Sequence, residues 1–315
     1  MEGILITVTV IICLSILIGL INYAAEYAFN KAFNKHKKTE EEAYEYLKKK
    51  NLYDKEIYDE IEREEVYIIS KDNLKLKGYL VEKYKDSNRY IILVHGYTAN
   101  NHIHMAFTRF FIKEGFNVLL VDERAHGESE GSYPSYGYFE REDLDRWIEF
   151  LSERIEGDLF LGLHGQSMGG ATVLMCGARN KKVNFIIEDC GYSSGKKIIK
   201  YQFTQVNWVP FNIVYLFLKI KVNRRVNFKF VNVCPIDDIS KVKTPIMFVH
   251  GKSDTYVPCY MAVDMYKIRN NESDRIFLVE GADHMWAYGK KKREYESIMH
   301  EFIENIEKTK EYGRI

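Results

Sequence analysis

The sequence predicts an α/β protein in which a mostly parallel central sheet has helices on both faces, a cap insertion and an N-terminal transmembrane helix. From Glu64 onward, short runs of β-branched and aliphatic residues alternate with segments of helical spacing, which is the pattern of a parallel sheet covered on both faces. This alternation breaks over residues 191–236, where we expect the cap. Residues 4–21 carry no charge and are almost wholly apolar, as in a membrane-spanning helix.

Length and composition restrict the class of protein. A chain of 315 residues, of which 46% are hydrophobic, can bury one large core with an insertion. Lys plus Arg and Asp plus Glu each number 45, so no charge imbalance points to nucleic acid. The five cysteines form no C-x-x-C pair and the nine histidines form no H-E-x-x-H motif. We therefore expect reduced thiols, no metal site, no cofactor and no nucleic acid partner.

The apolar segment near the amino terminus is expected to be a retained membrane anchor, residues 1–25. At about 1.5 Å per residue, a helix over 4–21 just spans a hydrocarbon core of roughly 30 Å. Only Glu2 precedes it, whereas a secretory signal peptide begins with basic residues and has a shorter apolar centre. The pair Ala24-Ala25 leaves cleavage open as the alternative.

The residues that follow the anchor are predominantly basic, against one acid, Glu26. The basic residues are Lys31, Lys35, Lys37 and Lys38. Because positive flanks stay in the cytoplasm, we expect a single-pass protein of the cell membrane with a cytoplasmic catalytic domain and its amino terminus outside. Residues 26–63 are predicted to form a charged helical stalk whose charge runs are solvated surface.

The α/β core is expected over 64–190 and 237–310. It opens with two alternating runs, 65–69 and 74–81, joined by the turn residues Lys71-Asp72-Asn73, which predicts a hairpin. Short apolar runs predict the remaining strands at 90–94, 116–121, 159–163, 185–188, 245–249 and 275–279. Apolar residues at helical spacing predict helices at 104–114, 140–153, 171–178, 260–267 and 292–306.

The insertion at 191–236 is rich in large apolar residues although it lies between two core strands. We expect it to fold as a cap or lid over the carboxyl edge of the sheet. Its large apolar residues are Tyr201, Phe203, Trp208, Phe211, Ile213, Tyr215, Leu216, Phe217 and Leu218. It has no Asp or Glu, and its basic residues are Lys196, Lys197, Lys200, Lys219, Lys221, Arg224, Arg225 and Lys229. Such a segment suggests contact with an anionic inner leaflet; the alternative is that it packs on the body with solvated lysines.

A candidate nucleophile lies where the strand at 159–163 runs into Gly165-Gln166-Ser167-Met168-Gly169 and then into a helix. This turn holds its central residue in a strained conformation, and the flanking glycines remove Cβ atoms that would collide. Ser167 therefore projects at the tip. A serine becomes a nucleophile only when a base takes its proton and donors stabilise the oxyanion; without those parts the motif is only a glycine-rich turn.

Residues that could supply those parts follow other strands of the predicted sheet. They lie after Val94, at Asp254 and at His284, and in open parallel sheets the working residues gather at the carboxyl ends of strands. The chain order is nucleophile, acid and then histidine. This order is typical of one enzyme superfamily.

With these residues the sequence resembles the α/β-hydrolase superfamily over about Glu64 to Ile306, and within it the bacterial branch of esterases, lipases and serine aminopeptidase-like hydrolases. The motifs that carry the resemblance are His95-Gly96, Asp122-Glu123-Arg124-Ala125-His126-Gly127-Glu128-Ser129, Gly165-Gln166-Ser167-Met168-Gly169-Gly170, His250-Gly251-Lys252-Ser253-Asp254-Thr255-Tyr256-Val257-Pro258 and Gly281-Ala282-Asp283-His284. It implies Ser167 as nucleophile, His284 as general base and then acid, and Asp254 as the carboxylate that orients the imidazole. In some relatives the acid follows another strand, which leaves Asp189 as the alternative.

The same resemblance implies that the backbone N–H groups of Tyr97 and Met168 form the oxyanion hole. The Tyr97 side chain could also line the pocket; the alternative for this side chain is aromatic packing under the cap. We interpret Asp122 and Arg124 as a structural brace of paired buried charges rather than as catalytic residues.

Ser167 at the elbow argues against the epoxide hydrolases and dehalogenases of this superfamily, which carry an aspartate there. We expect a membrane-anchored serine hydrolase that cleaves a small-molecule carboxylic ester through an acyl-enzyme, as a carboxylesterase or monoacylglycerol-type lipase. A peptidase would be expected to place acids near the substrate amine, and the cap has none. Glu188, Asp189 and Asp237 keep a serine aminopeptidase-like peptidase acting on an amide as an alternative. A catalytically silent, membrane-tethered scaffold is the other alternative.

Overall fold

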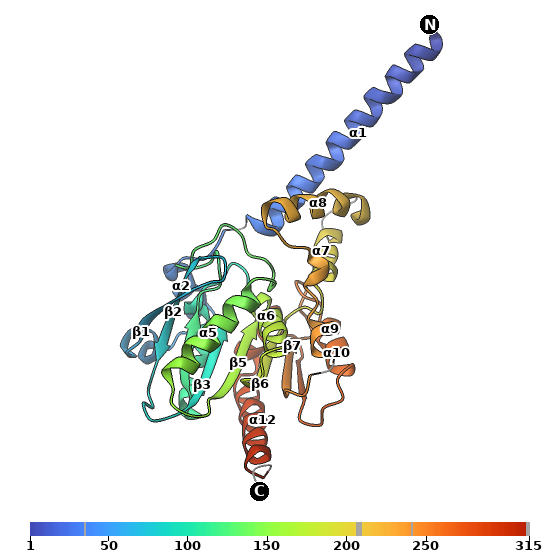
Figure 1. Ribbon diagram of the computed structural model, residues 1–315. Helices are drawn as coiled ribbons and strands as arrows, with labels where there is room; N and C mark the ends of the chain where they lie inside the picture. Colours follow the sequence, from blue (N-terminus) through green and yellow to red (C-terminus); the bar gives the residue numbers. More distant parts are fainter. Residues whose placement is uncertain (35, 206–209, 241, 313–315) are drawn as a thin grey trace.

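The central feature of the protein is an eight-stranded sheet, in the order β1-β2-β4-β3-β5-β6-β7-β8. The computed structural model describes residues 1–34, 36–205, 210–240 and 242–312 (Figure 1). The strands are β1 (Glu64–Ile69), β2 (Lys75–Val81), β3 (Arg89–Val94), β4 (Asn117–Val121), β5 (Phe160–Gln166), β6 (Val183–Asp189), β7 (Ile246–Gly251) and β8 (Arg275–Val279). Strands β1 and β2 form the predicted antiparallel hairpin, and all strands from β4 to β8 in the sheet order run parallel. The predicted fold class is confirmed.

Helices cover both faces of this sheet. Successive residues of β3 alternate between the two sides: Ile91 and Leu93 belong to one apolar core, and Ile92 and Val94 to the other, as the period of a strand requires. The helices are α3 (Asn101–His104), η2 (Met105–Phe107), α4 (Thr108–Lys113), α5 (Glu140–Arg154), α6 (Met168–Gly177), α10 (Tyr260–Lys267), α11 (Ala287–Lys290) and α12 (Lys292–Tyr312). Residues of η2, α4 and α12 pack on the first face, and residues of α5, α6 and α10 on the second.

The helical region after β3 begins earlier than the sequence predicts and is not one regular helix. A helix is predicted at 104–114, whereas α3 begins at Asn101 and is followed by the 3₁₀ turn η2. The Asp122 carboxylate accepts a hydrogen bond of 2.8 Å from the Asn101 N–H. This contact from the end of β4 satisfies a donor at the helix start, which the local sequence does not reveal.

Helix α1 (Glu2–Phe33) extends away from the body (Figure 1). It contains an 18-residue window of mean hydropathy 3.1 whose side chains are not buried, so by length and composition it could cross a membrane. The helix continues without a break past residue 25, where we expect the anchor to end. Its last turns pack against the body through the buried side chains of Ala25, Phe29 and Phe33.

The segment 26–63 packs against the body and does not form a separate stalk, although its charge runs at Glu40-Glu41-Glu42 and Lys48-Lys49 are exposed as predicted. Helix α2 (Glu40–Lys49) and the π-helix η1 (Glu56–Glu60) lie against the body. Ala43 and Leu47 are wholly buried because they are four positions apart and share one face of α2. The hydroxyl of Tyr58 donates a hydrogen bond of 2.8 Å to the His102 carbonyl. The charge runs of this segment occupy only its outer face.

Among the described residues between β6 and β7 there are two longer helices and two short ones. They are α7 (Gly195–Thr204), α8 (Phe211–Arg225), η3 (Phe230–Asn232) and α9 (Pro235–Ile239). Trp208 and Lys35 lie outside the described residues. Val214 and Leu218 of α8 share an apolar cluster with the end of α1 and with Met168 at the start of α6. The insertion therefore joins α1 to the carboxyl edge of the sheet (Figure 1).

Candidate active site

Ser167 lies in the sharp turn between β5 and α6 with φ +56° and ψ −115°. A Cβ atom on Gly165 would lie 2.2 Å from the Gly169 carbonyl oxygen, and one on Gly169 would lie 2.2 Å from the Val94 carbonyl oxygen. Only glycine fits at these two positions. The Ser167 N–H donates a hydrogen bond of 2.8 Å to the Asp189 carbonyl, which holds the strained turn.

The structure brings Ser167, His284 and Asp254 together at the carboxyl ends of three strands. His284, in the loop after β8, has Nε2 at 2.9 Å from Ser167 Oγ. Its other ring nitrogen, Nδ1, lies 2.7 Å from Asp254 Oδ2, in the loop after β7. An imidazole held between a hydroxyl and a carboxylate can accept the hydroxyl proton at Nε2 while Nδ1–H donates to the carboxylate.

The Asp254 carboxylate is fixed from both sides. Oδ1 accepts hydrogen bonds of 2.8 Å from the N–H groups of Tyr256 and Val257, and Oδ2 also lies 3.2 Å from His250 Nε2. Burial raises the pKa of Asp254, but hydrogen bonds from His250 and His284 more than offset it and hold that pKa well below its ordinary value. Asp254 is therefore ionised and acts as an acceptor.

His250 is a supporting residue to which the sequence analysis assigns no role. Burial lowers its pKa, but the hydrogen bond to Asp254 and the charge of Glu188 outweigh that effect and raise the pKa. Its Nε2–H also donates to the Val257 carbonyl at 2.8 Å. The signal in the sequence is its position at the end of β7, four residues before Asp254.

Asp189, the alternative acid, is engaged elsewhere. Its Oδ2 accepts hydrogen bonds from Gln166 Nε2 at 2.8 Å and from the Tyr295 hydroxyl at 3.2 Å. The residue is wholly buried at the end of β6, and burial raises its pKa. His284 binds Asp254 rather than Asp189, so the geometry favours Asp254 as the acid.

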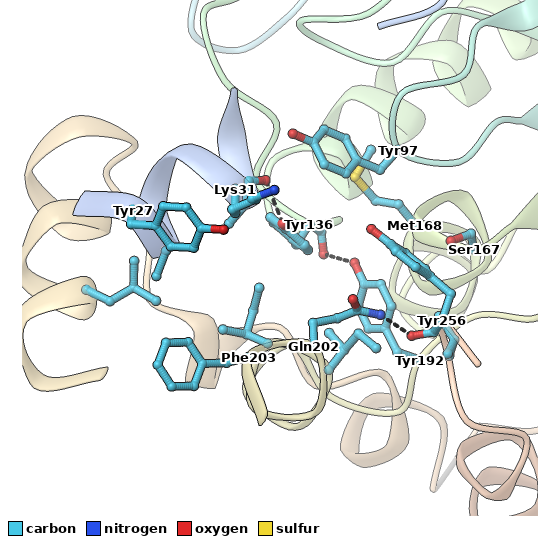
Figure 2. Close-up of a pocket in the computed structure, with 16 residues that line it drawn as sticks. Tyr27, Lys31, Tyr97, Tyr136, Ser167, Met168, Tyr192, Gln202, Phe203 and Tyr256 are labelled. Atoms are coloured by element: carbon cyan, nitrogen blue, oxygen red, sulfur yellow. Dashed lines mark hydrogen bonds between the residues drawn. The ribbon is translucent and has the colours of Figure 1, made fainter. Parts of the chain in front are cut away.

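The two residues expected to form the oxyanion hole lie beside Ser167. Met168 is the first residue of α6, so its N–H has no acceptor within the helix. Tyr97 follows Gly96, where a Cβ atom would lie 3.1 Å from the Ser167 Cβ. The role of these N–H groups stays a prediction. The Tyr97 side chain faces the same cavity as Met168 and Ser167 (Figure 2).

Two cavities, each of about 270 Å³, meet at Ser167. The first, which we call the α1 cavity, is lined from α1 by Tyr27, Ala28, Lys31 and Ala32, from α7 by Ile198, Ile199, Gln202 and Phe203, and from elsewhere by Tyr97, Tyr136, Ser167, Met168, Tyr192, Leu218, Tyr256 and Val257 (Figure 2). The second, the α2 cavity, is lined by Lys38, Tyr46, Tyr97, Thr98, Ala99, Ile103, Ser167, Tyr256, His284 and Met285. No site residue on α1 or α2 is predicted from the sequence, because nothing in the local sequence indicates that these helices reach Ser167.

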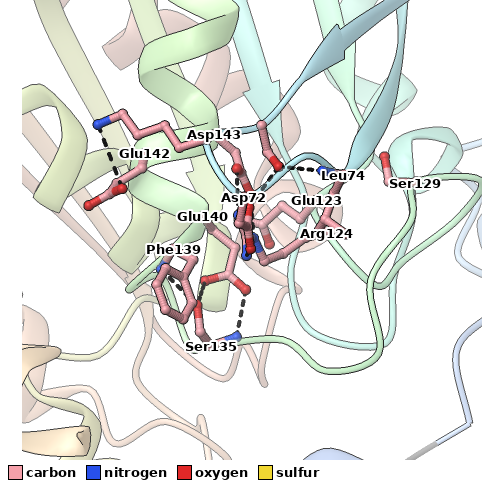
Figure 3. A network of polar contacts seen from close by, with 12 residues as sticks. Asp72, Leu74, Glu123, Arg124, Ser129, Ser135, Phe139, Glu140, Glu142 and Asp143 are labelled. Atoms are coloured by element: carbon pink, nitrogen blue, oxygen red, sulfur yellow. Dashed lines mark hydrogen bonds and ion pairs between the residues drawn. The ribbon is translucent and has the colours of Figure 1, made fainter. Parts of the chain in front are cut away.

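Asp122 and Arg124 form the predicted structural brace. The Arg124 guanidinium makes two hydrogen bonds to Asp143, of 2.6 and 2.7 Å, and two to Asp72, of 2.8 and 3.0 Å (Figure 3). Asp122 accepts from the N–H groups of Asn101 and Glu128. These contacts tie the hairpin turn, α5 and the loop after β4 to one another. The charge of Arg124 is paired as predicted, whereas Asp122 binds backbone N–H groups and not a charged partner among the described residues.

One group of three metal-ligand side chains occurs among the described residues, Cys190, Asp254 and His284, with ligand atoms within 4.8 Å of one another. Asp254 and His284 already bind each other in this group. Burial raises the pKa of the Cys190 thiol well above its ordinary value, which disfavours the thiolate that a metal ion needs. The cluster is part of the site just described.

Comparisons with known proteins agree with this architecture. Residues 85–222 match the family described as Hydrolase_4, serine aminopeptidase, S33. The uncharacterized protein YqkD of Bacillus subtilis is 29% identical over 262 residues, which cover 81% of this chain and 84% of that protein. The uncharacterized membrane protein YNL320W of Saccharomyces cerevisiae is 22% identical over 216 residues, which cover 68% of this chain and 70% of that protein.

A solved structure shows the same fold. The esterase Pf2001 of Pyrococcus furiosus superposes with a TM-score of 0.64 at 24% sequence identity, over 78% of this chain and 93% of the esterase. The sheet order, the serine at the β5–α6 turn and the matched family point to one conclusion. The chain has the α/β-hydrolase fold, and over residues 85–222 it is similar to the serine aminopeptidase family S33.

Proposed function

We propose that this protein is a serine hydrolase that cleaves a carboxylic ester through an acyl-enzyme, with Ser167, His284 and Asp254 as its catalytic triad. The single observation that carries the proposal is the relay of hydrogen bonds of 2.9 Å from Ser167 Oγ to His284 and of 2.7 Å from His284 to Asp254. The three residues follow β5, β7 and β8 at one edge of the sheet. The sheet therefore holds them in position before substrate binds.

The chemistry follows from this relay. Ser167 Oγ attacks the ester carbonyl carbon while its proton passes to His284 Nε2. The tetrahedral intermediate then expels the alcohol, which takes that proton from His284, and leaves an acyl group on Ser167. Water attacks the acyl-enzyme with His284 again accepting the proton, and the free acid and Ser167 are released. The backbone N–H groups of Met168 and Tyr97 stabilise the oxyanion in both halves of the reaction.

The two cavities divide the substrate at Ser167. The α1 cavity has apolar and aromatic walls, and among its described lining residues Lys31 is the one charged side chain. It suits an acyl chain, while the α2 cavity, with Lys38 and Thr98, receives the alcohol. The insertion 191–236 acts as the cap because Ile198, Phe203 and Leu218 form part of this wall.

A serine aminopeptidase-like activity is the second candidate, and the matched family description favours it. A free substrate amine needs a nearby carboxylate. Among the described residues that line the two cavities there is no Asp or Glu. Glu188 is wholly buried and binds the Gly191 N–H, and burial raises its pKa to about 8. It is therefore not an exposed anion for an amine.

Hydrolysis of p-nitrophenyl esters, measured beside aminoacyl p-nitroanilides with the full chain in detergent, tests the reaction. We expect kcat/KM to be at least about 100-fold higher on the best ester than on the best amide. A preference for the amides would favour the peptidase. Failure to react with both substrate series and with a fluorophosphonate probe would favour a silent scaffold.

We further propose that α1 spans the cell membrane once and that the catalytic domain is cytoplasmic. The uncharged part of α1 is exposed and apolar, and lysines follow it. Carboxyl-terminal fusions to green fluorescent protein and to alkaline phosphatase test the orientation, since the first fluoresces only inside and the second is active only outside. We expect the first fusion to fluoresce, the second to be inactive, and both to have the mass of the full-length chain. The opposite result for the two fusions would overturn the proposed orientation. A shortened chain would show that α1 is cleaved and not retained.

A further inference from the structure

The carboxyl-terminal turns of α1 form a wall of the cavity that contains Ser167. Tyr27, Ala28, Lys31 and Ala32 line this α1 cavity together with Ser167. In Figure 2 the labelled Tyr27 and Lys31 lie across the cavity from Ser167. These four residues lie on adjoining turns of the same helix whose earlier part is exposed and apolar. One continuous helix thus joins the proposed membrane span to the substrate site.

Ion pairs hold this part of α1 against the cap. The Glu26 carboxylate pairs with Lys221 Nζ at 2.8 Å and with the Arg225 guanidinium at 2.7 Å. The same guanidinium lies over the Phe29 ring, 4.7 Å from its centre. Such bidentate and stacked contacts fix direction as well as distance, so α8 and α1 form one unit.

A second set of contacts holds α1 against the core. The Tyr136 hydroxyl donates a hydrogen bond of 2.7 Å to the Ala32 carbonyl. The Phe33 ring packs edge-on against Tyr136, with ring centres 5.6 Å apart, and Phe33 is 1% exposed. The position of α1 relative to Ser167 is therefore set by packing and not by a flexible linker.

The cavity wall begins where the exposed apolar surface of α1 ends. Leu20 and Tyr23 are 62% and 73% exposed, whereas Ala25 is wholly buried. The exposed apolar side chains of α8, Ile213, Leu216 and Ile220, recur at helical spacing on one face. The basic insertion adds positive charge beside them, which suits an anionic lipid surface.

We propose that the membrane helix is itself the acyl-binding wall, and that the site takes a fatty ester with one long acyl chain directly from the bilayer. This inference rests on the proposed ester hydrolysis. One apolar cavity lies on one side of Ser167, so one acyl chain is bound, and its far end contacts Ala28 and Ala32. Short acyl groups remain near Ser167 and do not reach α1.

The test replaces Ala28, whose side chain lines the cavity, with tryptophan in the full chain. The matched control is Asn30→Trp, on an exposed residue of the same helix that does not line the cavity. We expect Ala28→Trp to lower kcat/KM on p-nitrophenyl laurate by at least about tenfold while kcat/KM on the butyrate ester stays within about threefold, as a filled pocket excludes only the longer chain. Asn30→Trp should leave both values unchanged.

The outcomes separate the two proposals. Hydrolysis of neither ester by the unmodified chain would overturn the proposed function and this inference with it. Hydrolysis of both esters with the same laurate-to-butyrate ratio in Ala28→Trp as in Asn30→Trp would overturn only the α1 wall. If Ala28→Trp loses both activities, the smaller change Ala32→Leu repeats the test, and an unchanged ratio there overturns the wall as well.

The source of the substrate is tested with the full chain in nanodiscs. A long-chain p-nitrophenyl ester is placed either in the same discs as the protein or in separate protein-free vesicles. We expect hydrolysis at least about tenfold faster in the shared discs, because the acyl chain then reaches α1 by lateral diffusion. Equal rates would show that the ester arrives through water and would overturn delivery from the bilayer.

Discussion

Replacing Ser167 with alanine is expected to lower kcat on the best ester by about 10⁴-fold to 10⁶-fold. The change removes the one oxygen that lies 2.9 Å from His284 Nε2, and alanine offers no atom that can bond to the acyl group. The residual rate would come from the oxyanion donors and from substrate binding alone. Stopped-flow or steady-state hydrolysis of the p-nitrophenyl ester measures the loss, and covalent labelling by a fluorophosphonate should vanish with it.

Ser193→Ala is the matched control for this change. Ser193 is a wholly buried serine whose hydroxyl has no hydrogen-bond partner among the described residues, so its loss should cost little stability. We expect kcat and fluorophosphonate labelling to match those of the unmodified chain. If Ser167→Ala kept full labelling or more than about a hundredth of the rate, Ser167 would not be the nucleophile.

The local parts of the site could be predicted from the sequence. The turn around Ser167 depends on two glycines that stand within two residues of it. A Cβ atom on Gly165 would collide with the start of α6, and one on Gly169 with the end of β3. His284 follows the last strand, and the last-strand position is visible as a short apolar run. Such features are local, so one sequence suffices to find them.

The assignment of Asp254 over Asp189 as the acid comes from the family resemblance, because the positions of the two residues in the chain do not decide between them. Asp189 ends β6, and Asp254 follows β7, which pairs with β6 in the sheet. Both carboxylates are therefore expected at the same edge. The decision depends on which of them the loop after β8 places against His284, and that is a long-range contact.

The position of α1 in the wall of the cavity could not be predicted from the sequence either. Glu26 and Lys221 are 195 positions apart in the chain. The local sequence around each of them predicts only a solvated charge beside apolar residues. Similarly, the buried pair Ala43 and Leu47 is surrounded by the charged residues of α2, so its apolar stripe is narrow. When a helix packs on the body through a few apolar residues and through ion pairs to distant residues, the periodic pattern of apolar residues in its sequence is weak.

Replacing Asp254 with asparagine is expected to lower kcat by about 10⁴-fold, although the shape of the side chain is unchanged. The Oδ1 position faces two backbone N–H groups, those of Tyr256 and Val257, so the amide oxygen of asparagine must occupy it. The amide NH₂ then replaces Oδ2 and faces His284 Nδ1 and His250 Nε2. His284 can bind this donor only with its proton on Nε2, and in that tautomer it cannot take the proton of Ser167.

The control that makes this result specific is Asp189→Asn. Asp189 Oδ2 accepts hydrogen bonds from Gln166 and Tyr295, and an asparagine oxygen in the same position can still accept both. We expect its kcat to fall by less than about tenfold, with melting curves showing that both variants fold. Asp189 lies at the end of β6, and Asp254 lies in the loop after the neighbouring strand β7. If loss of negative charge at this edge were the cause, kcat would therefore fall equally in both variants. Equal losses would therefore overturn Asp254 as the triad acid, whereas a large loss at Asp254 alone would show that the tautomer of His284 controls turnover.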